Sequence, residues 1–136
     1  MAWLLDTNVL SELRKGGRAD PAVQAWFRDA PDADLFTSVL VLGEIRRGIT
    51  RLARRDPVGA QSLERWLRGL AESFSNRILP VTAEVADLWG RLSSRQPLAP
   101  VDGLLAATAL DRGLILVTRN VSDFARADVS VLNPFG

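Results

Sequence analysis

Four acidic residues of this 136-residue sequence have the spacing best suited to chemistry: Asp6, Glu44, Asp102 and Asp123. Each lies close to a segment that we interpret as a strand, or on a helix joined to such a strand. The carboxyl ends of parallel strands share one edge of a sheet, and functional sites form outside that edge. We therefore expect the four carboxylates to meet in one pocket.

The composition decides which chemistry such a pocket supports. The sequence has no His and no Cys, which excludes a Ser-His-Asp triad, a cysteine nucleophile, a disulfide framework and zinc sites of imidazole or thiolate. Clustered carboxylates repel one another, by roughly 4 kcal/mol per pair at about 4 Å in a medium of intermediate polarity. A cation relieves this repulsion, and ligation by oxygen alone favours Mg²⁺, with Mn²⁺ as the alternative. Such an ion lowers the pKa of a water molecule and neutralises phosphoryl charge, so together with the arginines it favours phosphoryl chemistry, such as the cleavage of a phosphodiester.

Polar and basic side chains accompany the acids. Thr118 and Asn120 follow a strongly apolar segment, and they either position a water or a carboxylate or only close the turn there. The net charge is +1, yet 16 of the 17 basic residues are arginine, the residue suited to bidentate phosphate contacts. Five of them crowd one ten-residue stretch: Arg46, Arg47, Arg51, Arg54 and Arg55. This stretch is either a surface for nucleic acid or an ordinary solvated helix face.

Each acid also has a structural interpretation. Asp6 and Asp102 are natural helix N-caps, and Asp123 is typical of an Asx turn. Glu44 could pair with Arg47, three residues further along the same helix. Taken together, the structural interpretations are weaker, because Asp6 and Asp102 are flanked by apolar residues among which an unpaired carboxylate is unfavourable.

The elements that must position these residues alternate along the chain. Apolar runs predict strands at residues 3–5, 35–37, 77–81, 114–118 and 129–132. Helices are expected after Asp6 and over residues 21–29, 38–55, 57–73, 82–95 and 102–111, with Pro97 and Pro100 in a loop. Strands that alternate with helices predict a single α/β domain over residues 1–136, with a central parallel sheet of four or five strands flanked by helices.

The remaining signals concern packing and location. Trp3, Trp26, Trp66 and Trp89 lie beside strands or on apolar helix faces, which favours core or dimer packing over base stacking. No apolar run approaches the length of a membrane-spanning helix, and the first six residues lack a basic region. We expect a cytoplasmic protein without a membrane anchor.

Four ordered segments resemble the motifs of PIN-domain ribonucleases: residues 4–13, 42–49, 101–109 and 117–124. The segment 131–135 is similar to the VapC/FitB-type toxins of bacterial toxin–antitoxin pairs. The resemblance spans the whole chain and implies a three-layer PIN-like fold. It places the family's acidic residues at Asp6, Glu44, Asp102 and Asp123, with Thr118 and Asn120 as polar helpers.

The resemblance also implies a function. It predicts a Mg²⁺-dependent endoribonuclease that acts on tRNA or rRNA and is inhibited by a cognate antitoxin. It further implies a homodimer that meets promoter DNA only through the antitoxin. Arg46, Arg47 and Arg51 are then candidates for contact with RNA or antitoxin.

Two other functions stay open. One is a phosphatase or DNA nuclease on a similar sheet, although Asp6-Thr7-Asn8 lacks the Asp-x-Asp of an aspartyl-phosphate phosphatase. The other is a catalytically silent module that binds an antitoxin in a transcription-regulating complex.

Overall fold

A five-stranded parallel sheet forms the centre of the protein in the computed structural model, which describes residues 1–95 and 98–136. The strand order is β3-β2-β1-β4-β5, and every neighbouring pair runs parallel. The strands are β1 (Trp3–Leu5), β2 (Leu35–Ser38), β3 (Ile78–Leu79), β4 (Ile115–Val117) and β5 (Val131–Leu132). The predicted α/β class and parallel sheet are confirmed.

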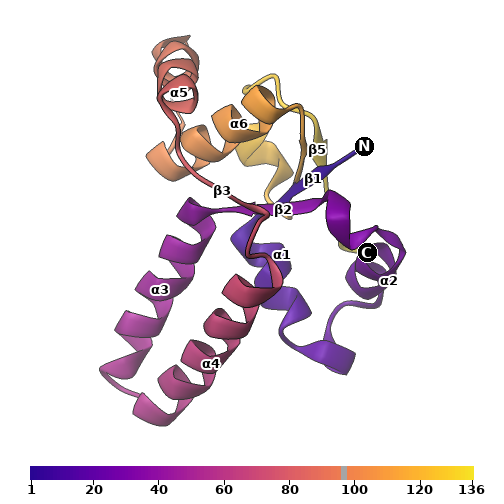
Figure 1. Ribbon diagram of the computed structural model, residues 1–136, viewed down its shortest axis with the longest axis vertical. Coiled ribbons are helices and arrows are strands. Elements are labelled where there is room, and N and C mark those ends of the chain that lie inside the picture. The colour runs from indigo at the N-terminus through magenta and orange to yellow at the C-terminus, as the bar shows by residue number, and fades with distance from the viewer. Residues whose placement is uncertain (96–97) are drawn as a thin grey trace.

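Helices cover both faces of this sheet and give the fold three layers. Within the described residues they are α1 (Thr7–Leu13), α2 (Pro21–Asp29), α3 (Val39–Ala53), α4 (Pro57–Ser73), α5 (Ala83–Arg95) and α6 (Pro100–Arg112), with short 3-10 turns η1 (Gly16–Arg18), η2 (Asp32–Asp34) and η3 (Val121–Phe124). Figure 1 shows α5 and α6 on one side of the strands and α1 to α4 on the other.

The first strand of the chain occupies the middle of the sheet. β1 pairs with β2 through Trp3 and Leu35, and with β4 through Trp3 and Ile115. Leu4 and Leu5 are completely buried, as expected for a strand that is covered on both faces. The end of β1 is therefore flanked by the ends of β2 and β4, and residues that follow these strands are brought together.

Local sequence signals explain where several helices begin and end. Asp20 and Asp56 cap α2 and α4 with their carboxylates, and each precedes a proline at the first helical position. The hydroxyl of Thr82 accepts a hydrogen bond from the backbone N–H of Val85 and so caps α5. Gly113 ends α6 in the left-handed conformation, with φ of 66°. The helices predicted over residues 21–29 and 57–73 are confirmed with the same bounds.

The start of α6 differs from the prediction. The helix begins at Pro100 and not at Asp102, because proline is well suited to the first turn of a helix, where its missing N–H has no partner to lose. Ala99 is the N-cap residue, so the interpretation of Asp102 as a cap is wrong. Pro97 lies outside the described residues. The strands at 77–81, 114–118 and 129–132 are shorter than predicted.

Helices α3 and α4 form a hairpin, which we call the helical arm (residues 39–73), and it extends away from the sheet (Figure 1). Its helices pack together through apolar faces on which Ile45, Ile49, Ala60 and Leu67 are buried. The arginines at positions 46, 47, 51, 54 and 55 are exposed on it.

Trp3, Trp26 and Trp89 serve packing, as predicted. Trp3 and Trp26 meet edge to face with ring centroids 5.8 Å apart, and with Trp66 they flank the buried core. Trp89 of α5 lies against α6, where a Cβ added at Gly103 would stand 2.8 Å from the Trp89 ring. In the described ranges, no helix is both long and apolar enough to cross a membrane.

Candidate active site

Asp6 lies directly after β1 and is the N-cap of α1. One carboxylate oxygen accepts a hydrogen bond from the Thr7 backbone N–H at 2.7 Å, and the other accepts from the Thr118 hydroxyl at 2.9 Å. The residue is only 6% exposed. A buried carboxylate with both oxygens hydrogen-bonded is held in one orientation at the sheet edge.

The hydroxyl of Thr118 is the centre of the hydrogen-bond network at this edge. It donates to Asp6 and accepts from the Asn8 side-chain amide and from the Asn120 backbone N–H, both at 3.1 Å. One donated and two accepted bonds use the full capacity of a hydroxyl. Thr118 is fully buried, whereas Asn120 contributes to the network through its backbone and its side chain is exposed.

Two residues of this network, Thr7 and Asn8, were missed by the sequence reasoning. The Thr7 hydroxyl donates to Glu44 at 2.7 Å and joins α1 to α3. The Asn8 side-chain carbonyl accepts from the Arg119 backbone N–H at 3.0 Å, which fixes the turn after β4. The available signal for both is a polar side chain in the first turn of the helix that follows a central strand.

Glu44 lies on α3, two turns into the arm, and faces α1. It forms its hydrogen bond with Thr7. Among the described residues no ion pair joins Glu44 to Arg47, so that alternative interpretation is not supported. Glu44 therefore presents its carboxyl group to the first residue of α1, next to the end of β1.

Asp102 and Asp123 complete the predicted acidic set. Asp102 is half-buried in the first turn of α6, and Asp123 is exposed in η3 after β4. Burial raises the pKa of Asp102 above its usual value, and the charges of Asp6, Asp123 and Glu44 raise it further. The charges of the other three acids therefore act on Asp102, although the four acids come from separate segments.

Burial also raises the pKa of Asp6 above its usual value, and the charge of Asp123 adds to this effect. The hydrogen bonds from Thr118 and Thr7 act in the opposite direction but do not cancel it. The ionised form of Asp6 is therefore disfavoured unless a positive charge comes close.

The donor set fits a hard divalent cation in its chemistry. All candidate ligands are carboxylate oxygens, and their mutual repulsion is the kind that Mg²⁺ or Mn²⁺ relieves. In their spacing the acids form a loose cluster: within residues 1–95 and 98–136, no three acidic side chains are close enough together to make a preassembled metal site. Metal ligation by Asp6, Glu44, Asp102 and Asp123 stays a prediction.

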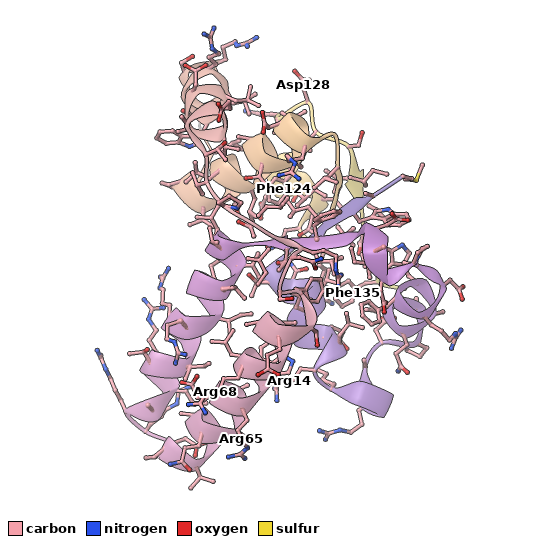
Figure 2. The ribbon with its side chains drawn as sticks, viewed as in Figure 1. Arg14, Arg65, Arg68, Phe124, Asp128 and Phe135 are labelled. Atoms are coloured by element: carbon pink, nitrogen blue, oxygen red, sulfur yellow. The ribbon has the colours of Figure 1, made fainter. Side chains whose placement is uncertain are left out.

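The predicted nucleic-acid contacts differ from one another. Arg46 forms a bidentate ion pair with Glu64 of α4, with 2.8 Å between Arg46 Nη2 and Glu64 Oε2. The charge of Arg46 is therefore paired with that of Glu64 within the arm. Arg47 and Arg51 are exposed and are not part of this pair. Beside the network, the guanidinium of Arg119 lies 4.8 Å from the ring centroid of Phe135, which Figure 2 labels near α1 and α2.

The chain is similar to characterised proteins along almost its entire length. Residues 3–130 match the family model of the PIN domain. The chain is 33% identical over 139 residues to Toxin FitB of Neisseria gonorrhoeae, with 97% of each chain covered. It is 31% identical over 140 residues to VapC ribonuclease Y4jK of Sinorhizobium fredii, with 97% of this chain and 96% of the relative covered.

Solved structures show the same similarity to toxins of this kind. The crystal structure of FitAcB from Neisseria gonorrhoeae superposes with a TM-score of 0.87 at 32% identity, with 97% of both chains covered. The structure of FitAB bound to the IR36 DNA fragment has a TM-score of 0.86 at 29% identity, with 98% of this chain and 96% of that chain covered. A toxin–antitoxin complex from Klebsiella pneumoniae has a TM-score of 0.75 at 25% identity, with 99% and 98% covered. The resemblance seen in the motifs is confirmed, and the chain belongs to the PIN-domain family, with Toxin FitB and VapC ribonuclease Y4jK among its relatives.

Proposed function

We propose that this protein is a divalent-metal-dependent endoribonuclease and the toxin of a toxin–antitoxin pair. The observation that carries the proposal is the buried Asp6, oriented by Thr118, whose charge acts together with those of Asp123 and Glu44 on Asp102. The names of its relatives, a VapC ribonuclease and a toxin, support the same activity.

The four acids would hold the cation, Mg²⁺ or alternatively Mn²⁺. When bound, the ion supplies charge neutralisation for the phosphoryl group and a lowered pKa for water. The protein's own groups supply orientation: Thr118 fixes Asp6, and Thr7 fixes Glu44. The backbone N–H of Asn120 helps to orient Thr118, and its exposed side chain is available to the substrate.

The proposed substrate is a structured cellular RNA, tRNA or rRNA, and the proposed location is the cytoplasm. The proposed partners are a cognate antitoxin and a second copy of this chain. Similar structures are a toxin–antitoxin complex and FitAB on a DNA fragment, which supports a complex that meets promoter DNA through the antitoxin. Arg47 and Arg51, exposed on the arm, are available to RNA or antitoxin.

The test is cleavage of total tRNA and rRNA by the purified protein with Mg²⁺, with Mn²⁺ and with EDTA. We expect cleavage with either ion, none with EDTA and none with Asp6→Asn, whose fold is checked by circular dichroism. Attack by water leaves 5′-phosphate and 3′-hydroxyl ends, whereas a 2′,3′-cyclic phosphate product would refute this chemistry.

Other outcomes would point elsewhere. Equal cleavage of single-stranded DNA would favour a general nuclease. A folded protein that binds RNA or antitoxin but cleaves nothing with either metal would favour the silent binding module.

A further inference from the structure

A pocket of about 350 Å³ lies between α1 and the helical arm, next to the candidate active site. One end is formed by Thr7 and Glu44, the pair joined by the 2.7 Å hydrogen bond. The other end is formed by Trp66 of α4 and by Arg14, which directly follows α1. A molecule in this pocket therefore extends from a catalytic carboxylate to an aromatic ring.

The charge of the pocket favours an anionic occupant. Among the described residues that line it, the charged ones are Arg14, Arg55 and Glu44. Both arginines are exposed, and Glu44 belongs to the proposed metal site. With the carboxylate committed to a cation, the rest of the pocket presents positive charge to its contents.

Trp66 and Arg14 together form a surface suited to a nucleotide. The guanidinium of Arg14 lies 6.0 Å from the centroid of the Trp66 ring, and Figure 2 shows Arg14 beside α4. Unpaired bases of RNA stack on aromatic rings and on guanidinium planes, while arginine also contacts the phosphate. The Trp66 ring suits the base of a nucleotide, and the arginine suits its phosphate.

We infer that this pocket binds one unpaired nucleotide of the RNA substrate, adjacent to the phosphodiester that is cleaved. The inference rests on the proposed function. The base stacks at Trp66, Arg14 and Arg55 face the backbone phosphate, and the chain continues past Thr7 toward Glu44. Substrates then need a single-stranded position beside the cut.

A larger side chain at Gly48 would fill the pocket directly. Gly48 lines the pocket on α3, one turn after Glu44, and a Cβ built on it meets no atom within 4 Å. Leucine at this position can fill the pocket and is also a better helix former than glycine. Gly69 on α4 is the matched control, because it has equal open space and is not among the residues that line this pocket.

The first experiment measures the binding of an RNA that the unmodified protein cleaves. The proteins carry Asp6→Asn so that the fluorescein-labelled strand stays intact, and the readout is fluorescence anisotropy. We expect Gly48→Leu to raise Kd about tenfold, the effect of losing one stacked base, and Gly69→Leu to leave it within about twofold. Unchanged binding by a folded Gly48→Leu protein would overturn the inference.

The second experiment locates the base. Single abasic positions are placed on either side of the cut, and kcat/KM is measured for the enzyme, Trp66→Leu and Trp66→Phe. One abasic position should reduce cleavage by the enzyme and by Trp66→Phe about tenfold, and it should have no further effect on Trp66→Leu. Arg14→Gln, an exposed change, should weaken binding without altering Tm. Equal sensitivity of all proteins to every abasic position would contradict base stacking at Trp66.

The two proposals fail in different ways. If the unmodified protein cleaves no RNA, the proposed function fails. If it cleaves RNA and the pocket variants cleave equally well, only this inference fails, and the pocket is left to a protein partner.

Discussion

The sheet edge and the helical arm are organised in opposite ways. At the edge, the buried Thr118 hydroxyl makes all the hydrogen bonds that it can, to Asp6, Asn8 and Asn120. On the arm, two amphipathic helices pack along an apolar seam, and the main polar contact is the exposed pair of Arg46 with Glu64. The edge depends on a few specific bonds, whereas the arm depends on buried area.

This difference separates two tasks. A group that takes part in chemistry must be held within a fraction of an ångström, and strands with locked neighbours provide such rigidity. A surface that binds RNA or a protein partner tolerates adjustment. The exposed arginines on the helical arm provide positive charge on side chains that are free to move. The predictions below ask whether the two regions respond as differently as their bonding implies.

The largest effect is expected from Thr118→Val. The change leaves the Asn120 N–H without its side-chain partner, and the Asn8 amide and one Asp6 oxygen keep only their 3.5 Å hydrogen bond with each other. We therefore expect a loss of about 2–3 kcal/mol in the free energy of unfolding, together with loss of cleavage. Urea unfolding measures it. Thr108→Val is the control, because within the described part of the chain that buried hydroxyl bonds only the Leu104 carbonyl of its own helix. If both variants lost the same free energy of unfolding, the hydrogen-bond network of Thr118 would contribute no more to stability than a single buried hydroxyl.

Replacing glycine by alanine should change the free energy of unfolding in opposite directions in the two regions. Gly103→Ala brings a Cβ within 2.8 Å of Trp89 and displaces the turn that carries Asp102, so we expect a loss of about 1–3 kcal/mol. Gly69→Ala on the arm meets open space and should gain about 0.5–1 kcal/mol. Thermal unfolding of both variants checks this, and a gain at Gly103 would show that α6 is not held tightly.

Asp102→Asn should stabilise the protein near neutral pH. Because the folded state raises the pKa of Asp102 above that of the unfolded chain, wild-type stability falls as pH rises through the interval between the two values. Removing the charge should raise Tm by about 2 °C at pH 7. The gain should disappear as pH falls toward the unfolded pKa, and a gain that is the same at every pH would exclude charge as its cause.

The smallest effect is expected from Arg46→Gln. Its ion pair with Glu64 is partly exposed, and such pairs contribute little to stability, by an amount that salt diminishes. Urea unfolding at low and high salt measures this loss, with the exposed Arg47→Gln as the reference. A loss above about 2 kcal/mol would show that the arm, too, depends on a specific polar bond.

The elements were predictable because their signals are local. Asp-Pro pairs set the starts of α2 and α4, and Gly113 sets the end of α6. Pro100 was misread as a loop residue because proline both interrupts helices and begins them.

The site was predictable only in outline. The parallel strand order explains why Asp6, Asp102 and Asp123 are expected at one edge of the sheet, but it does not set the distances between their side chains. The bonds of Thr7 with Glu44 and of Arg46 with Glu64 depend on side-chain rotamers and on the register of packed helices, which no local pattern encodes.

The central position of β1 has a consequence for synthesis on the ribosome. Residues 3–5 are made first, yet one of their two neighbours in the sheet is residues 115–117, and the hydroxyl that orients Asp6 is 112 positions further along. A nascent chain therefore lacks the oriented carboxylate until Thr118 has been translated. Ribosome-stalled fragments that end before β4 should be inert, however well their helices have formed.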